Sequence, residues 1–238
     1  MKKLYSAKEI QEDIEDKIRK EIYKPDDKLA TEKKMMETYG VSRTTIRNVI
    51  NALLVKRIVY KIPDVGVFVE KEIIRKTNKI MGFTELVLDS GRIPKTVLEN
   101  HGKKIPSEKI LDEMNLPLNT EVFYMQRKRY INDQPFLYED VYISPLQAKD
   151  IEKYDLEKES LYDILRNKYN INIHYLKEKV SAVTVDHKIS DFLYQTSTGY
   201  ALKVEGLSYD LEDKVIEYGI SYYHAKNFSF ESVLVSQK

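Results

Sequence analysis

The first 70 residues place hydrophobic positions at helical spacing in three successive segments. In "SAKEIQEDIEDKIRKEIY", isoleucine recurs every four residues, and Ser6 followed by Glu9 is a capping-box pattern. "TEKKMMETYG" predicts a short second helix from a Thr31 cap to Gly40, which suits the left-handed position after a helix. Only one residue then separates Gly40 from the next cap, Ser42. The pattern predicts a long first helix, followed by two helices joined by a tight turn.

The third helix begins after Ser42 and has one apolar face. That face falls at i, i+3, i+4, i+7 and i+8 and consists of Ile46, Val49, Ile50, Leu53 and Leu54. The opposite face then consists of Arg43, Thr44, Arg47, Asn48 and Asn51. After the helix, "RIVYKIPDVGVFV" predicts two short β-branched strands joined near Gly66. Three helices with a tight turn, followed by a hairpin, predict a winged helix-turn-helix.

The polar face of the third helix carries chemistry suited to DNA. The planar fork of Arg43 matches the O6 and N7 acceptors of guanine, and Arg47 lies one turn further along. The hydroxyls of Ser42, Thr44 and Thr45 suit phosphate oxygens. A solvated helix in a small α-bundle is the alternative. Because cap, turn, apolar face and hairpin agree with one another, we expect the helix to read a major groove.

Beyond the hairpin the pattern changes to period-2 alternation rich in tyrosine. Helical spacing returns only near residues 106–115, 145–153, 160–169 and 187–194. The charged stretch "EKEIIRKTNK" separates the two regimes and lacks Pro and Gly. We therefore expect an α+β chain with a mainly antiparallel sheet in its second part. The expected domains are a DNA-binding domain at 1–70, a linker at 71–80 and an effector-binding and dimerisation domain at 81–238.

The hairpin "VFYMQRKRYINDQPFLYEDVYI" mixes charges into apolar strand faces. Alternation places Arg127 and Arg129 on one face with Phe123 and Met125. The facing strand places Glu139 on one face with Leu137, Val141 and Ile143. If these faces turn inward, the charges must be paired or bound to a ligand, because unpaired buried charge is costly. The alternative is a cross-strand Arg-Glu pair on a solvated sheet.

Two further segments offer ligand chemistry. In "YALKVEGLSYDLEDKVIEYGISYYHA", alternation places Glu217, Gly219, Ser221 and Tyr223 on one face, where the glycine leaves room for an approaching group. "ESLYDILRNKY" predicts a helix starting at Ser160, whose free N–H groups form an anion site that Tyr162 can complete. An ordinary helix cap is the alternative for the second segment.

Composition removes several classes of function. The chain has 238 residues, 42% hydrophobic and 32% charged, which is typical of a folded globular protein. Cysteine is absent, which excludes disulfides, thiolate catalysis and thiolate metal sites. Four histidines show no metal-ligand spacing, and no Gly-rich phosphate loop or nucleophile elbow is present. No apolar run approaches the length of a membrane span. We expect a cytoplasmic protein with no metal and no cofactor.

Charge is divided unevenly along the chain. Residues 1–75 hold 17 Lys and Arg against 13 Asp and Glu, or +4, and the total of +1 leaves −3 for the remainder. Between residues 31 and 61, two acidic residues face seven basic ones: Lys33, Lys34, Arg43, Arg47, Lys56, Arg57 and Lys61. Such a local basic excess favours a nucleic-acid partner for the first domain.

The N-terminal motifs resemble a known family. "KLATEKKMMETYGVSRTTIRNVINALLVKRIV" followed by "GVFV" is similar to the DNA-binding domain of GntR-type bacterial transcription regulators, whose pattern runs L-P-S-E, G-V-S-R-T-T-[VI]-R and G-x-G-T-F-V. The similarity covers nearly all of residues 5–70. Here Ala30 and Thr31 replace Pro-Ser, and the hairpin keeps one of the two glycines. The resemblance implies DNA contacts at Lys33, Ser42, Arg43, Thr44, Thr45, Arg47 and Gly66.

Residues 81–236 resemble the UTRA effector-binding domain of the HutC subfamily, which has a chorismate-lyase-like fold. The shared patterns are F-[ST]-E, R-x-R, P-[IF]-x-x-E, S-L-Y and a late E-Y before a tyrosine pair. Two departures are Gly82, where serine is common, and His224-Ala225, where arginine or glycine is common. The family binds small metabolites, often phosphorylated sugars. The resemblance implies effector contacts at Thr84, Arg127, Arg129, Glu139, Ser160, Tyr162, Glu217 and Tyr223.

The expected function is therefore a ligand-responsive transcription regulator that is not an enzyme. We expect a repressor released by a small anionic metabolite such as a sugar phosphate. A single recognition helix reads only a few base pairs, so a homodimer on a pseudopalindromic operator follows from geometry. The alternatives are a chorismate-lyase-like enzyme and an effector domain for an amino acid or organic acid. A purely architectural DNA-binder has no need of a ligand-shaped second domain.

Overall fold

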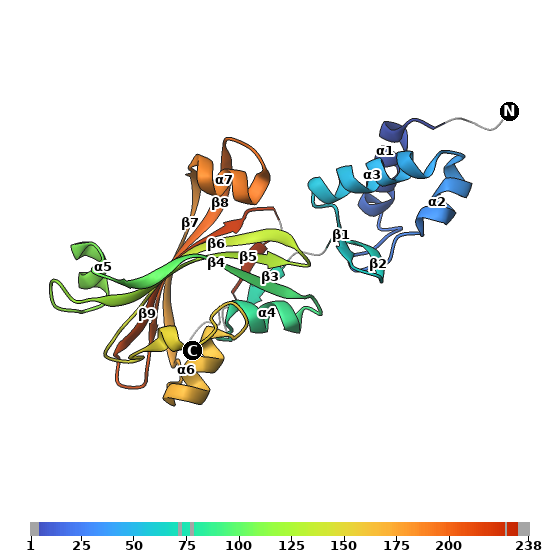
Figure 1. Ribbon diagram of the computed structural model, residues 1–238. Helices are drawn as coiled ribbons and strands as arrows, with labels where there is room; N and C mark the ends of the chain where they lie inside the picture. The colour runs from blue at the N-terminus through green and yellow to red at the C-terminus, as the bar shows by residue number, and fades with distance from the viewer. Residues whose placement is uncertain (1–4, 71–72, 77–78, 227, 233–238) are drawn as a thin grey trace, which may run out of the picture. The chain divides into compact units, whose positions relative to one another are not determined.

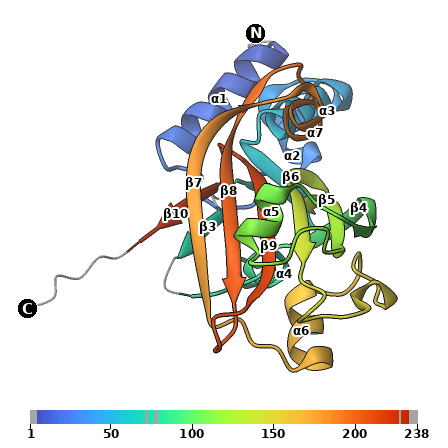
Figure 2. The ribbon, with the colours of Figure 1, turned by 90° about the vertical axis from the view of Figure 1, so that its left-hand side faces the viewer.

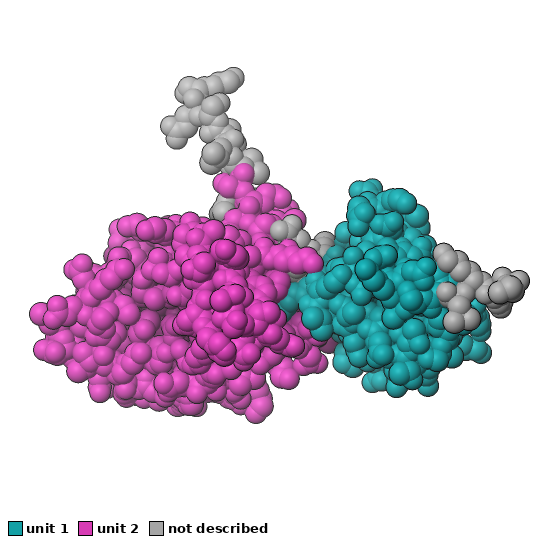
Figure 3. All heavy atoms as spheres, turned by 90° about the horizontal axis from the view of Figure 1, so that it is seen from above, with its two compact units in different colours: residues 1–72 teal, residues 73–238 magenta. Residues whose placement is uncertain are grey.

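The computed structural model describes residues 5–70, 73–76, 79–226 and 228–232. The chain forms two compact units, residues 1–72 and 73–238, which are coloured separately in Figure 3. Within the described residues, no helix is both long and apolar enough to cross a membrane. The α+β class expected from the sequence is confirmed, with three helices first and a mainly antiparallel sheet after them.

The first unit begins with helix α1, Ala7–Arg19, whose capping box between Ser6 and Glu9 is present in both directions. The helix buries Ile10 and Ile14. It ends before the last isoleucine of the repeat, and Ile22 is 64% exposed. The chain therefore leaves the helix one turn earlier than the hydrophobic spacing predicts, because the backbone at Glu21 takes a positive φ of 56°.

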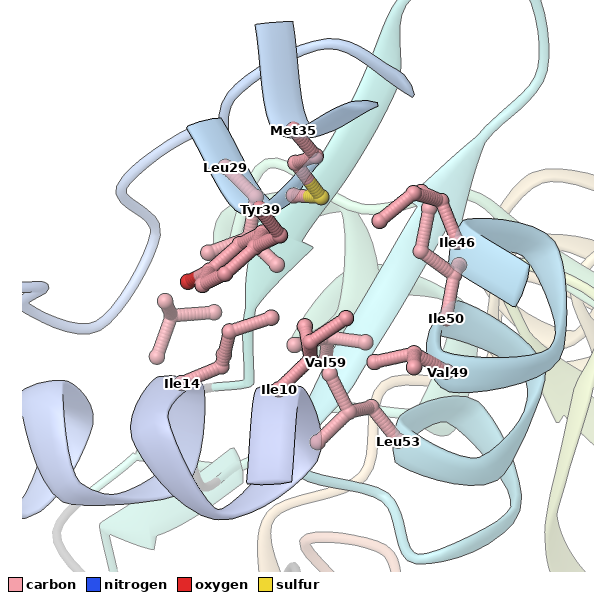
Figure 4. Close-up of a cluster of buried hydrophobic side chains, with 11 residues drawn as sticks. Ile10, Ile14, Leu29, Met35, Tyr39, Ile46, Val49, Ile50, Leu53 and Val59 are labelled. Carbon is pink, nitrogen blue, oxygen red and sulfur yellow. The ribbon is translucent and has the colours of Figure 1, made fainter. Parts of the chain in front are cut away.

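Helices α2, Glu32–Tyr39, and α3, Arg43–Val55, are joined by the predicted tight turn (Figure 1). Thr31 and Ser42 cap them, and Gly40 has the expected left-handed φ of 68°. The apolar face of α3 packs against α1 and α2, as the close-up in Figure 4 shows. This cluster includes Ile10, Ile14, Met35, Tyr39, Ile46, Val49, Ile50, Leu53 and Val59.

Strands β1, Val59–Ile62, and β2, Gly66–Val69, form the predicted antiparallel hairpin. Tyr60 stacks on Phe68 across the two strands, with ring centroids 5.5 Å apart. Val69 is buried in the core of the three helices. The hairpin is thus fixed to the helices by its first and last residues, and the winged helix-turn-helix arrangement is complete.

The second unit is built on a six-stranded sheet in the order β4-β5-β6-β9-β8-β7, in which all neighbours are antiparallel. These strands are β4, Pro94–Lys104; β5, Val122–Ile131; β6, Gln134–Ile143; β7, Tyr175–Val185; β8, Gly199–Tyr209; and β9, Val215–His224. Two predicted hairpins, β5-β6 and β8-β9, lie next to each other because β6 pairs with β9. The strands that carry the candidate site residues are therefore at the centre of the sheet.

Helices cover both faces of this sheet (Figures 1 and 2). Helix α6, Leu161–Tyr169, packs on the face that carries Met125 and Val141. Helix α7, His187–Tyr194, packs on the opposite face against Tyr138. Shorter helices are α5, Glu108–Glu113, and the 3-10 helix η1, Ile151–Lys153. All four predicted helical regions contain a helix, but α4, Phe83–Asp89, was not predicted.

A separate two-stranded sheet pairs β3, Ile73–Lys76, in parallel with β10, Phe228–Glu231. Ile73 and Phe228 are buried against α4 and against Tyr223 of β9. The sequence assigns residues 71–80 to a linker, and four of these residues form β3 within the second unit. Their short β-branched run, "IIRK", carried the signal for a strand.

Candidate functional site

A cavity lies on the face of the six-stranded sheet that α4 and α6 cover. The space between its lining residues is about 700 Å³, counted with the solvent at its open mouth. Gly206 of β8 and Gly219 of β9 are cross-strand partners, and both line it. Other residues on this face of the sheet fill the space above it with their side chains. Because neither glycine has a side chain, a hollow remains above the centre of the sheet.

The eight effector residues expected from the sequence all line this cavity. They are Thr84, Arg127, Arg129, Glu139, Ser160, Tyr162, Glu217 and Tyr223. They come from β5, β6 and β9 and from the starts of α4 and α6. The structure therefore brings together side chains that are up to 139 residues apart in the sequence.

The most strongly charged wall consists of Arg127, Arg129 and Glu139. The arginines are 3% and 5% exposed. Nε of Arg127 lies 2.7 Å from Oε1 of Glu139, and Nε of Arg129 lies 2.5 Å from the same oxygen. Burial alone raises the pKa of Glu139, but the two guanidiniums outweigh burial and lower it. One carboxylate thus faces two cations, which leaves an excess positive charge on this wall.

These arginines turn inward and are buried, so the alternative of a pair on a solvated sheet is wrong. Arg127 lies opposite Glu139 in the β5-β6 register, and Arg129 reaches the same carboxylate from two residues further along the strand. Both arginines also line the cavity. Arg129 additionally donates to Oγ1 of Thr96 and lies over the ring of Phe83. The pair therefore holds the two guanidiniums in place and leaves part of each facing the cavity.

The start of helix α6 forms the opposite wall. Oγ of Ser160 accepts a hydrogen bond from N–H of Asp163, as an N-cap does. Burial raises the pKa of Tyr162 well above its usual value, so its hydroxyl is a neutral donor. The ring of Tyr162 packs over Gly82, where a Cβ would lie 3.2 Å from the ring. The absence of a side chain at Gly82 therefore leaves room for this tyrosine.

Glu217 lies between these walls and has an unusual proton affinity. Burial raises its pKa to about 7, with the Arg127 charge acting in the opposite direction and the Glu139 charge adding to the rise. Its Oε2 is buried and has no hydrogen-bond partner in the part of the chain that the structure describes. Near neutral pH this side chain is therefore close to half protonated and can donate or accept a hydrogen bond.

Two charged residues of the cavity were missed by sequence reasoning. Arg75 of β3 and Glu178 of β7 form an ion pair, with Nη1 and Oε1 separated by 2.8 Å. The Arg75 side chain is 12% exposed and that of Glu178 is 22% exposed. Arg75 falls in the segment assigned to a linker, and Glu178 falls in an edge strand with little alternation. Only the fold brings these two residues to the cavity.

A second candidate surface is the polar face of helix α3. Arg43, Thr44 and Arg47 are exposed, as expected for a helix that enters a groove. Nε of Arg43 lies 2.7 Å from Oε2 of Glu32, and Nε of Arg47 lies 3.3 Å from Oε1 of the same carboxylate. Hydrogen bonds from Arg43 lead the effects that lower the pKa of Glu32. Both arginines are therefore held side by side by a residue at the start of α2.

Other residues of this surface divide into two groups. Lys33 and Ser42 are exposed, and Oγ of Ser42 lies 2.9 Å from Oγ1 of Thr45. Lys56, in contrast, pairs with Glu15 of α1, and Arg57 is buried. Arg57 therefore does not contribute to the basic surface, and the charge of Lys56 is partly neutralised by Glu15.

The turn of the hairpin has a lysine that the sequence did not single out. Gly66 has a φ of 152°, and a Cβ there would lie 2.6 Å from Cε of Lys28. The end of the Lys28 side chain therefore lies beside Gly66, and the positive φ at this position favours glycine. A hollow between this turn and α3 is lined by Lys28, Arg47, Asn51 and Lys61, among others.

The described residues contain no group of three or more acidic or histidine side chains placed to hold a metal. The cavity chemistry is instead that of anion and hydroxyl recognition, with guanidiniums, a helix start, tyrosine hydroxyls and carboxylates.

Two family models match the chain and together account for both units. Residues 6–69 match "Bacterial regulatory proteins, gntR family", and residues 89–229, more than half of the chain, match "UTRA domain". The protein is a GntR-family regulator with a UTRA domain. It is thus a DNA-binding transcription regulator that responds to a small-molecule effector, and it is not an enzyme.

Individual relatives support this assignment. The chain is 22% identical over 203 residues to a probable fructoselysine utilization operon transcriptional repressor of Escherichia coli O157:H7, covering 84% of this chain and 83% of that protein. It is 26% identical over 192 residues to the regulator YurK of Bacillus subtilis, covering 76% and 79%. The crystal structure of PhnF from Mycobacterium smegmatis shares the fold, with a TM-score of 0.65 at 16% identity over 96% of this chain and all of that one.

Proposed function

We propose that this regulator is a homodimeric repressor whose operator binding is weakened by a small anionic metabolite such as a sugar phosphate. The observation that carries the effector class is the wall formed by Arg127 and Arg129. Two buried guanidiniums share the single carboxylate of Glu139, so the cavity holds cationic charge that a bound anion would neutralise.

The opposite wall supports the same effector class. The N–H groups at the start of α6 and the hydroxyl of Ser160 suit phosphate oxygens. The carboxyls of Glu139 and Glu217 suit the hydroxyls of a sugar. The cavity therefore offers donors for an anionic group and acceptors for a polyol within one site.

The DNA side of the proposal assigns base readout to Arg43 and Arg47 on α3. Lys33, Ser42, Thr44, Thr45 and the backbone at Gly66 are then phosphate contacts that set the position of the helix. Because α3 is only 13 residues long, one copy reads one half-site. Two copies related by a two-fold axis would read a pseudopalindromic operator, so we propose a homodimer that acts on DNA in the cytoplasm.

A thermal-shift screen of the full chain tests the effector class. Phosphorylated sugars, their unphosphorylated forms, amino acids and organic acids are compared at equal ionic strength, because a ligand of the folded state raises the melting temperature with its saturation. We expect phosphorylated sugars to stabilise the protein and their neutral forms to do so less. If only amino acids or only organic acids stabilise the protein, that class is the effector and the sugar phosphate is not.

The Arg127→Ala variant shows whether the cavity is the site. Glu139 keeps Arg129 at 2.5 Å in this variant, so it does not become an unpaired buried charge, and we expect the melting temperature to change little. Stabilisation by the screened ligand should be lost. Arg166→Ala is the control, since Arg166 is exposed, lies on α6 and does not line the cavity. If the ligand stabilises Arg127→Ala as much as the wild type, the effector binds elsewhere.

A further inference from the structure

Arg75 differs from Arg127 and Arg129, the other arginines of the cavity, in its ion-pair partner and in its place in the chain. It lines the cavity, its side chain is 12% exposed, and its partner Glu178 is itself more exposed than it is. It also lies on β3, the strand that follows the DNA-binding unit three residues after β2 ends at Val69. The cavity therefore contains one cation that belongs to the connection between the two units.

Strand β3 points its residues alternately toward and away from the core of the second unit. Ile73 is buried and Arg75 nearly so, whereas Ile74 is 42% exposed. The strand is held by its pairing with β10 and by the packing of Ile73. The ion pair with Glu178 adds a polar contact from β3 to β7 of the main sheet. A change in the partner of Arg75 therefore acts on β3 directly.

The position of Glu178 depends on the hollow in the sheet. Its cross-strand partner is Gly206, and a Cβ at Gly206 would lie 3.3 Å from Cγ of Glu178. The carboxylate can therefore lean over the sheet toward the cavity and reach Arg75. When an anion enters the cavity, Arg75 is already paired with the Glu178 carboxylate. The anion and this carboxylate must then compete for the guanidinium or share it.

Tyr162, Arg75 and Arg127 all line the same cavity. The charges of Arg75 and Glu178 both influence the pKa of the Tyr162 hydroxyl, whose rise is caused mainly by burial. Arg127 lines the same cavity, so an anion beside this hydroxyl at the start of α6 lies in the field of both arginines.

We propose that Arg75 is a third arginine of the anion site, and that a bound anion takes this guanidinium from Glu178 and so transmits occupancy to β3. This inference rests on the proposed effector class. In this proposal Arg75 has two roles. It contributes to anion affinity, and it links the cavity to the strand that follows the DNA-binding unit. Glu178 is then an internal competitor that occupies Arg75 when no anion is bound.

The test uses the full chain and inorganic phosphate as the probe, titrated at constant ionic strength by calorimetry. Arg75→Gln should weaken phosphate binding by about tenfold, the loss of one charge-assisted hydrogen bond. Glu178→Gln should strengthen it several-fold, because the competitor is gone. The double variant should behave as Arg75→Gln does, and it leaves neither charge unpaired, so it remains informative if the single variant folds poorly. Arg166→Gln and Glu212→Gln are exposed controls that should match the wild type.

Operator affinity gives the second readout, measured with a DNA fragment selected by the full chain from a random library. Glu178→Gln should bind this fragment more weakly even without phosphate, since Arg75 is already released. If Arg75→Gln and Glu178→Gln both bind phosphate as the wild type does while Arg127→Ala loses binding, the role of Arg75 is wrong and the effector class stands. If phosphate binds neither the wild type nor any variant, the role of Arg75 and the proposed effector class are both wrong.

Discussion

At the scale of single residues, the cavity shows how one fold gives two glutamates different proton affinities. Two adjacent guanidiniums keep Glu139 ionised although it is buried. Glu217 is half-buried, its Oε2 is buried without a hydrogen-bond partner among the described residues, and desolvation raises its pKa to about 7. Environment, and not residue type, therefore decides which carboxyl can change its charge near neutral pH.

Glu217 predicts a pH dependence of stability. Its pKa rises from 4.5 in a reference environment to about 7 on folding, so the folded state holds the proton more tightly. The resulting stabilisation is complete below about pH 4.5 and is lost as the pH rises through about 7. Relative to Glu217→Gln, the wild type should lose roughly 2 to 3 kcal/mol of unfolding free energy between pH 5 and 8. Urea unfolding of both proteins across this range measures the difference. Parallel pH profiles would show that Glu217 titrates normally.

Replacing Arg43 should reduce the base specificity of operator binding. If its guanidinium contacts guanine, Arg43→Ala should cost about 1 to 3 kcal/mol of operator binding and relax the preference at one base position. Binding to a panel of single-base operator variants measures both effects. Lys33→Ala is the matched comparison, because a phosphate contact should weaken all sequences equally and reduce the salt slope by about 1. If Arg43→Ala binds the operator with unchanged affinity, α3 does not read the groove through this residue.

At the scale of elements, the hollow of the sheet is made by paired glycines and not by loops. Gly219 and Gly206 face each other at the centre of the β8-β9 pair. A Cβ at Gly219 would meet Oε1 of Glu217 at 3.6 Å, an ordinary contact. Gly219→Ala should therefore fold with unchanged or slightly higher stability, since alanine restricts the unfolded chain. The added methyl projects into the cavity.

We expect Gly219→Ala to lower effector affinity by about tenfold or more without loss of operator binding. Calorimetry with the ligand found in the screen, together with the melting temperature, measures the two properties separately. Gly102→Ala is an informative contrast, because that glycine has a φ of 144° and open space around it. It should reduce stability and leave effector affinity unchanged. A Gly219→Ala protein with wild-type effector affinity would place the ligand away from the sheet centre.

The sequence predicted most elements because their signals are local. Caps at Ser6, Thr31 and Ser42 and the left-handed Gly40 depend on neighbouring residues only. The face shared by Arg127 and Arg129 follows from strict alternation. Helix α4 was missed because its cap is Gly82, which makes no side-chain cap bond and gives no pattern to detect.

The role of Arg75 in the cavity could not be predicted because it depends on long-range pairing. β3 pairs with β10, a partner more than 150 residues away in the sequence, and no local pattern specifies that register. The ion pair with Glu178 likewise joins segments that only the fold brings together. The basic excess of the first unit correctly indicated a nucleic-acid partner. It could not show which cations stay available, since Lys56 pairs with Glu15 and Arg57 is buried.

At the scale of the whole molecule, a sensor and a DNA reader are joined in one chain by a segment that enters the sensor's own fold. Residues 70–72 separate β2 of the first unit from β3 of the second, and β3 contributes a side chain to the cavity. Effector occupancy and operator binding are therefore properties of one thermodynamic system. If effector binding changes operator affinity, the coupling free energy between the two sites is the same in both directions.

This linkage makes a prediction that needs no knowledge of the path between the sites. An effector that weakens operator affinity by a given factor must bind more weakly to the operator complex by that same factor, which is typically about 5 to 150. We expect effector titrations of the free protein and of the protein saturated with operator to give dissociation constants in this ratio. Operator titrations with and without saturating effector should return the same number. A DNA fragment of equal length without the operator sequence is the control, since it should leave effector affinity unchanged. Equal effector affinities with and without operator would show that the ligand, although bound in the cavity, does not regulate this protein.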